Sequence, residues 1–380
     1  MDTTARETEC SAEEVLFVAV EMGWKRWKVG TTVALGQKPR MKSLDGGDVE
    51  AFVAELERAK RRFGLSPTAR VKCCFEAGRD GFWFHRFLEA QGIENVVVDP
   101  ASVSVNRRRR RRKTDRLDAV KLLNHLIHWH QGQTKEWSVA QVPSVADEDA
   151  RQFHRELECL RKERTRSVNR IKGLLAAQGV RLKSVGRDFL KLLEEARLWD
   201  GSKVPPQLRS RLGREYERMQ LVQRQMNELQ RQRREALKRA EDPRLDQVRK
   251  LRQLRSIGDK GAWLLVMEFF GWREFRNGRQ VGSLAGLTPT PFDSGGGDRE
   301  QGIDKAGNPR VRAMAIELAW CWLRFQPQSE LSLWYEKRFG AGSKRSRRVG
   351  IVALARKLLI ALWRYLETGE VPEGALLKIA

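Results

Sequence analysis

The N-terminal part of the chain alternates between short apolar runs and amphipathic stretches. Residues 15–20 form an apolar run rich in β-branched side chains, and a second strand-like run spans residues 27–35. Runs of this length predict strands, here joined as a hairpin. Residues 48–63 then carry apolar side chains at helical spacing, which predicts a helix.

The same alternation continues up to a basic segment. Residues 70–75 and 96–98 predict two further strands, residues 81–91 a helix between them, and a last helix begins near residue 115. The resulting order is hairpin, helix, strand, helix, strand, helix. This order is typical of an α/β layer.

The middle of the chain has a helical pattern throughout. Residues 147–241 are dominated by Arg, Lys, Glu, Gln and Leu, with a break at Pro205-Pro206. On both sides of the break, apolar residues recur every three or four positions, which predicts an extended helical pair or coiled-coil arm. Dimerisation, contact with nucleic acid and spacing of two domains all remain open as its role.

The C-terminal part is predicted to be mostly helical. Residues 251–265 form a helix, a turn at Gly258 and a second helix, which resembles a helix-hairpin-helix whose turn amides hold a backbone phosphate. A plain αα-hairpin fits equally well. The tail, residues 311–366, also predicts helices. We expect its tryptophans in the core, namely Trp320, Trp322, Trp334 and Trp363.

Between these helices, residues 284–297 have the composition of a loop. Ser294 stands directly before three glycines. A serine hydroxyl beside free backbone amides suits a nucleophile on a phosphate-binding loop. The pattern alone favours the simpler interpretation, a turn residue in a Gly-rich surface loop.

The charge of the chain points to a polyanionic partner. It has 73 Lys and Arg against 49 Asp and Glu, a formal net charge of +24. Such an excess predicts nucleic-acid binding, and its spread along the chain argues against a membrane-surface helix. No apolar window is long enough for a membrane span. The five cysteines show no metal-binding or disulfide spacing, which favours a cytoplasmic protein.

The densest cations precede two aspartates. Asp115 and Asp118 follow the block directly and, on a helix, lie one turn apart, where both carboxylates could hold a divalent cation. Helix capping is the alternative. The block consists of Arg107, Arg108, Arg109, Arg110, Arg111, Arg112 and Lys113.

Two further acids lie at the ends of predicted strands. Glu21 closes the first strand of the hairpin, and Glu76 closes the strand over residues 70–75. Together with Asp115 and Asp118 they could hold two divalent ions that act on a phosphodiester. Each acid taken alone is also compatible with a cap or a surface position.

These features together resemble the DEDD transposases of insertion sequences, also called bridge-RNA-guided recombinases. The resemblance covers nearly the whole chain and is most specific over residues 113–119, Lys-Thr-Asp-Arg-Leu-Asp-Ala. It implies a ribonuclease-H/RuvC-like α/β domain over residues 1–145. A coiled-coil-like helical arm would follow over residues 146–245, and a transposase domain with the helix-hairpin-helix-like element over residues 246–380.

The resemblance also implies the chemistry. Ser294 matches the catalytic serine of the family, and Glu21, Glu76, Asp115 and Asp118 match the acids that bind Mg²⁺ or Mn²⁺. The family usually has Asp at the first position, so Glu21 adds a methylene and shifts the carboxylate by ~1.5 Å. Metal binding at that position therefore stays open.

The implied partners are nucleic acids and further copies of the chain. The resemblance implies element and target DNA, a structured guide RNA that supplies sequence choice by base pairing, a homodimer or homotetramer, and no membrane. Besides the basic block, the expected nucleic-acid contacts are Gly258, Lys260, Lys305, Arg310 and Arg312.

Two other functions remain open. One is a RuvC-type metal-dependent junction nuclease that cuts with activated water, and the other is a nucleic-acid-binding protein without catalysis. A covalent protein–DNA adduct distinguishes the serine recombinase from both.

Overall fold

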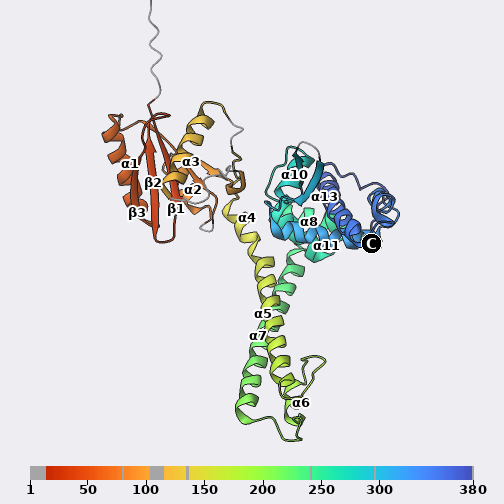
Figure 1. Cartoon of the computed structure of the whole chain (residues 1–380). Helices are drawn as coiled ribbons and strands as arrows, with labels where there is room; N and C mark the ends of the chain where they lie inside the picture. Colours follow the sequence, from red (N-terminus) through yellow and green to blue (C-terminus); the bar gives the residue numbers. More distant parts are fainter. Residues whose placement is uncertain are drawn as a thin grey trace, which may run out of the picture. The chain divides into compact units, whose positions relative to one another are not determined.

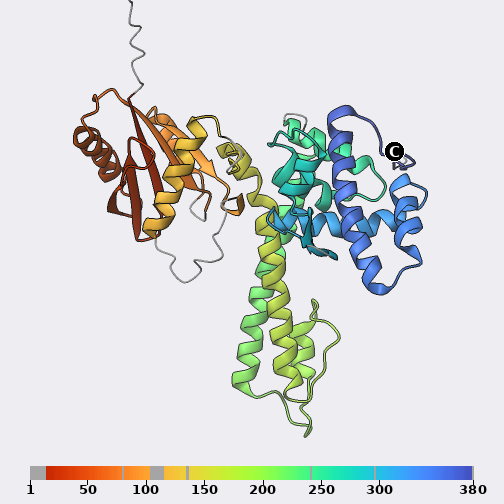
Figure 2. The same cartoon turned by 45° about the horizontal axis from the view of Figure 1, so that its top comes forward.

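The computed structural model forms two compact units, residues Met1–Pro143 and Ser144–Ala380. It describes residues 14–78, 81–102, 115–133, 137–239, 242–294 and 297–378 (Figures 1 and 2). The basic block at residues 107–113 lies outside these ranges. None of the helices in the described ranges is both long and apolar enough for a membrane span.

The first unit is built on a mixed five-stranded sheet in the order β3-β2-β1-β4-β5. The central strand β1 pairs antiparallel with β2 and parallel with β4, which in turn pairs parallel with β5. The strands are β1 Val15–Met22, β2 Arg26–Thr32, β3 Arg40–Asp45, β4 Arg70–Glu76 and β5 Glu94–Val98. The predicted hairpin is therefore confirmed, whereas the edge strand β3 was not predicted.

Helices cover both faces of this sheet. On one face, α1 (Val49–Phe63) and α2 (Trp83–Ala90) pack through Phe52 and Phe84, which are fully buried. On the other face lies α3 (Asp115–His130), which shares a separate buried cluster with Ala19 of β1. The alternation of side chains along β1 separates the two cores.

The second unit begins with a pair of long helices. After α4 (Val145–Ala150), α5 (Gln152–Ala176) and α7 (Pro206–Ala236) run side by side (Figure 1). They pack through apolar residues at helical spacing, Leu157, Leu160, Val222 and Met226. The predicted helical pair is present. The short helix α6 (Phe189–Glu195), which lies between the two in sequence, was not predicted.

The rest of this unit packs around one apolar core. Its elements are α8 Pro243–Gln253, α9 Asp259–Leu265, the π-helix η3 Val266–Phe270, α10 Gly278–Leu284, β6 Pro289–Ser294, β7 Gly297–Ile303, α11 Pro309–Phe325, α12 Glu330–Tyr335, η4 Glu336–Gly340 and α13 Lys344–Thr368. Trp322 is fully buried as predicted, whereas Trp320 is 50% exposed. The prediction for Trp320 was wrong. Trp320 lies two positions before Trp322 on α11, and residues two positions apart on a helix point to different faces.

The segment expected to be a loop forms a hairpin instead. β6 and β7 pair antiparallel, with Ser294 opposite Gly297 and a register shift near Pro291. Prolines and glycines suggested a loop, but a two-stranded ribbon consists only of edge strands, where proline is tolerated. The prediction of a loop is therefore corrected for residues 289–294 and for Gly297, which form strands, while Gly295 and Gly296 lie outside the described residues.

Candidate functional site

The acids of β1 and β4 lie side by side. Val20 of β1 is opposite Phe75 of β4 in the parallel pair, and Glu21 and Glu76 are the next residues on the two strands. Because the strands run in the same direction, both carboxylates lie at the same end of the sheet, where β1 and β4 reach their C-termini.

Both acids belong to the face of the sheet that α3 covers. Ala19 of β1 and Cys74 of β4 share a buried cluster with Leu122 and Leu123 of α3. The two acids follow Ala19 and Cys74 by two positions, and side chains of a strand alternate with period two. The strand-end carboxylates and α3 therefore lie on the same side of the sheet.

The first turn of α3 carries Asp118. This residue is half-buried, and its Oδ2 is buried with no hydrogen-bond partner among the described residues. A buried carboxylate oxygen without a donor is unfavourable, and a bound cation would relieve that penalty. Asp115 begins the same helix, but its side chain lies outside the described part of the structure.

The described carboxylates do not form a complete metal site. Among the side chains that the structure describes, no three from His, Cys, Asp and Glu are grouped closely enough to hold a metal ion. The fold does bring Glu21, Glu76 and the first turn of α3 to one face of one sheet. Asp115 is the remaining acid that would have to complete the set.

The position of α3 on the sheet depends on Gly30 of β2. A Cβ atom at this position would lie 3.1 Å from Cδ1 of Leu123 and 3.2 Å from Sδ of Met41. We expect Gly30→Val to destabilise the protein by ~1–3 kcal/mol, because the added methyl groups overpack this contact. Urea unfolding would measure the change, with Gly30→Ala as the milder control. A valine variant as stable as the wild type would contradict this packing.

Ser294 lies at the end of the β6–β7 hairpin. It is the last residue of β6, and the base of the hairpin is closed by the Asp304 amide, which donates to the carbonyl of Thr288 (3.0 Å). The chain then reaches α11 through Gly307. A side chain at Gly307 would overlap the backbone of Leu284 and Gly286, so only glycine fits there. The hairpin base is thus fixed against the end of α10.

A buried carboxylate that the sequence did not single out lies next to the N-cap residue of α11, Asn308. Glu268 of η3 is 1% exposed. Its Oε1 accepts hydrogen bonds from Nε2 of His154 (2.8 Å) and Nε of Arg155 (2.7 Å), and its Oε2 from Nη2 of Arg155 (2.9 Å) and Nδ2 of Asn308 (3.2 Å). Burial alone would raise the pKa of Glu268, but the hydrogen bonds from His154 and Arg155 outweigh it and lower the pKa far below its ordinary value.

These bonds join the base of the arm to the start of α11. His154 and Arg155 belong to α5, whereas Asn308 is the N-cap of α11 and accepts from the Arg310 amide (2.9 Å). Nε of Arg310 in turn donates to Glu158 of α5 (2.9 Å). The only sequence sign of this junction is one acid within the apolar run over residues 264–270.

Several predicted nucleic-acid contacts already have partners within the protein. Nζ of Lys260 pairs with Glu317 (3.1 Å), and Nη1 of Arg312 donates to the carbonyl of Lys305 (3.1 Å). Lys305 itself has a positive φ of 62°. Gly258 is the N-cap of α9 and offers no side-chain cap. The predicted helix, turn and helix over residues 251–265 are present, and phosphate binding there stays a prediction.

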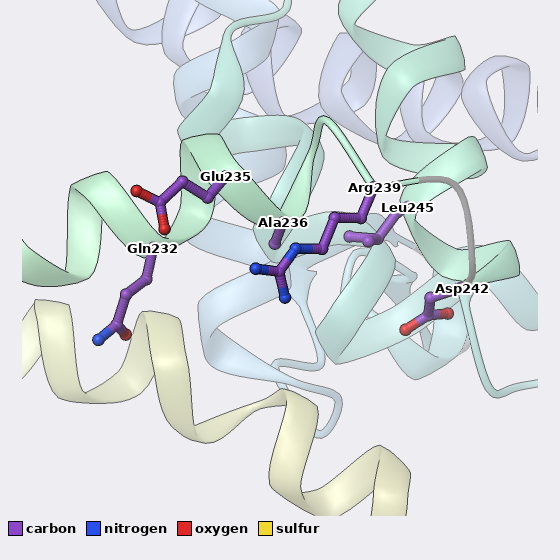
Figure 3. A pocket seen from close by; sticks show the side chains of 6 residues that line it. All are labelled: Gln232, Glu235, Ala236, Arg239, Asp242 and Leu245. Carbon is purple, nitrogen blue, oxygen red and sulfur yellow. The ribbon is translucent and has the colours of Figure 1, made fainter.

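A hollow of about 370 Å³ lies where α7 ends and α8 begins (Figure 3). Its two carboxylates are engaged, because Glu235 accepts from Arg231 (3.0 Å) and Asp242 from Arg244 (2.9 Å). The hollow is lined by Gln232, Glu235, Ala236, Arg239, Asp242 and Leu245. It therefore holds none of the predicted catalytic groups.

Comparison with known proteins gives the class. Residues 248–332 match the family model described as Transposase IS116/IS110/IS902 family. The chain is 39% identical over 378 residues to the Sinorhizobium fredii protein y4rJ, whose name assigns it as a transposase, covering 96% of this chain and 94% of that protein.

More distant relatives carry similar names. The transposase for insertion sequence element IS1533 of Leptospira borgpetersenii is 24% identical, covering 81% of this chain and 84% of that protein. The transposase for IS1111A of Coxiella burnetii is 23% identical, covering 86% and 87%. The protein is thus an insertion-sequence transposase, an enzyme that recombines DNA. It belongs to the IS116/IS110/IS902 transposase family.

Proposed function

We propose that this transposase cuts and rejoins DNA through Ser294, assisted by a carboxylate cluster that holds Mg²⁺ or Mn²⁺. The cluster comprises Glu21, Glu76, Asp115 and Asp118. The observation that supports it best is that two strand-end acids and the first turn of α3 lie on the same face of the sheet. The sheet order β3-β2-β1-β4-β5 supports a ribonuclease-H/RuvC-like domain.

The buried Oδ2 of Asp118 fits a cation ligand. A bound divalent ion would neutralise charge on the scissile phosphate. The carboxylates of Glu21 and Glu76 would orient that ion from the C-terminal ends of β1 and β4. Asp115 and Asp118 would orient it from the start of α3. Glu21 retains the charge of the usual aspartate, and its longer side chain requires a small adjustment of the site.

The serine would supply the nucleophile. Oγ of Ser294 attacks the phosphorus, a new P–O bond to serine forms, and the bond to one deoxyribose oxygen breaks. The serine proton leaves and the released deoxyribose oxygen gains one, so that a phosphoserine and a free hydroxyl result. Attack of a hydroxyl from another strand on the phosphoserine reverses these changes and joins the strands. The phosphodiester is conserved without hydrolysis.

The proposal includes a guide RNA and an oligomer. A net charge of +24 suits a protein that holds both DNA and a structured RNA encoded by the element, whose base pairing would choose the sites. The acids and Ser294 are far apart in sequence, with the helical arm between them. A homodimer or homotetramer would let one copy complete the site of another.

The test detects the covalent intermediate. The full-length protein is incubated with element-end DNA, Mg²⁺ and RNA transcribed from the element's flanks, and products are separated on a denaturing gel. We expect a protease-sensitive protein–DNA adduct. Strand cleavage without any adduct would instead indicate a hydrolytic nuclease. DNA binding without cleavage would indicate a nucleic-acid-binding protein with no chemistry.

A further inference from the structure

The most exposed tryptophan of the second unit lies at the far end of the α5–α7 pair. Trp199 is 82% exposed and stands in the segment between α6 and α7. A tryptophan side chain normally buries much of its apolar surface in a folded protein. Its exposure here therefore needs a reason.

The turn that carries Trp199 has a defined backbone. Arg197 and Lys203 form a β-bridge, and the Leu198 amide donates to the carbonyl of Ser202 (2.8 Å). Both the amide and the hydroxyl of Ser202 donate to Oδ1 of Asp200 (2.9 and 2.7 Å). The indole is thus presented by a hydrogen-bonded turn.

The same turn rests against the end of α5. Gly179 has a positive φ of 83°, and a Cβ atom there would lie 3.0 Å from Cβ of Trp199. Residues 177–205 between α5 and α7, called the tip below, pack on a separate apolar cluster. This cluster includes Phe189 and Tyr216. The Tyr216 hydroxyl donates to the carbonyls of Gly186 and Arg187 (3.0 and 2.9 Å). The tip is therefore a small packed platform.

Exposed cations are spaced along the segment that forms this platform. Residues 181–203 hold six cations and four acids, all ten of them exposed, which gives the segment a net charge of +2. The cations are Arg181, Lys183, Arg187, Lys191, Arg197 and Lys203. An exposed aromatic ring among exposed cations is the combination with which proteins stack unpaired bases and hold their phosphates.

The available apolar area argues against a protein partner at Trp199. A stable protein interface buries ~800 Å² on each partner, a little more than half of it apolar, whereas among the described residues between α5 and α7 the exposed large apolar side chains are only Trp199, Leu190 and Leu192. A single base needs no more than one ring face.

We propose that the arm tip is a nucleic-acid-binding site in which Trp199 stacks on an unpaired base of DNA or RNA, while the exposed cations of the same segment contact the phosphates. The site contains none of the acids or the serine of the proposed reaction. Its existence is therefore independent of the catalytic mechanism.

The test measures binding of full-length protein without Mg²⁺, so that catalysis plays no part. The probes are fluorescein-labelled oligothymidylate, oligouridylate and a mixed-sequence DNA duplex, followed by anisotropy. We expect Trp199→Ala to weaken binding of one or both single strands by ~5- to 150-fold and to leave duplex binding nearly unchanged. Trp199→Phe should retain most of the affinity, and the strand affected more identifies DNA or RNA.

Leu190→Ala is the matched control, because Leu190 is 49% exposed on the same tip but cannot stack. It should bind like the wild type. A photocrosslink from 5-iodouridine strands should map to residues 197–203. Unchanged binding by Trp199→Ala together with no crosslink there would overturn the proposal. So would a loss of binding that coincides with a smaller oligomer in sedimentation, since the tip would then contact a second copy.

Discussion

Replacing Ser294 by alanine is expected to abolish the covalent protein–DNA adduct. The variant lacks the oxygen that forms the new bond to phosphorus, so strand cleavage should fall by on the order of 10⁶-fold, as when a serine nucleophile is removed from a hydrolase. DNA and RNA binding should persist, because the charge of the protein is unchanged. Adduct yield on a denaturing gel and affinity by anisotropy measure the two effects separately.

Two further variants make this result specific. Ser283→Ala removes an exposed serine of α10 and should leave the adduct unchanged. Asp118→Asn keeps the serine but weakens the carboxylate cluster, so the adduct should decrease strongly in Mg²⁺. Full cleavage by Ser294→Ala would assign the nucleophile to another group or to water. An undiminished adduct with Asp118→Asn would remove the carboxylates from the reaction.

Local patterns predicted most of the first unit. The β-branched run of β1 and the apolar spacing of α1 are strong enough to fix each element by itself. β3 was missed because Arg40–Asp45 buries only Leu44 and forms through pairing with β2. An edge strand of this kind depends on its neighbour more than on its own composition.

The second unit shows where sequence patterns are insufficient. Glycine frees the backbone and proline fixes φ and removes a donor, so both disfavour a strand locally, whereas the β6–β7 hairpin results from the pairing of two segments. Glu268 was missed for a similar reason. Its partner His154 lies 114 residues away, and nothing near Glu268 in sequence identifies that partner. The candidate acids were predictable because strand ends are local features.

Replacing Glu268 by glutamine is expected to destabilise the second unit by about 3 kcal/mol, the lower end of what breaking a buried ion pair costs. Glutamine is neutral and turns one acceptor oxygen into a donor, which then faces the donors of Arg155 or Asn308. Arg155 is 36% exposed, so water compensates part of its charge. Urea unfolding at neutral pH would measure the difference from the wild type.

The matched control is Glu158→Gln. Glu158 also links the arm to α11, through Arg310, but its side chain is 38% exposed, so we expect a loss of less than ~1 kcal/mol. If the junction positions the serine hairpin, Glu268→Gln should also slow adduct formation in protein that remains folded, with DNA affinity retained. Equal effects of the two substitutions would contradict the special role of Glu268.

Lowering the pH should reduce the difference in unfolding free energy between the wild type and Glu268→Gln. Because hydrogen bonds from His154 and Arg155 lower the pKa of Glu268, its ionised form stabilises the folded state fully above the ordinary glutamate pKa of ~4.3. That contribution is lost as the pH falls from there toward the lowered pKa, whereas glutamine does not titrate. A gap in unfolding free energy that stays constant from neutral pH to below ~4 would show that the charge of Glu268 does not stabilise this junction.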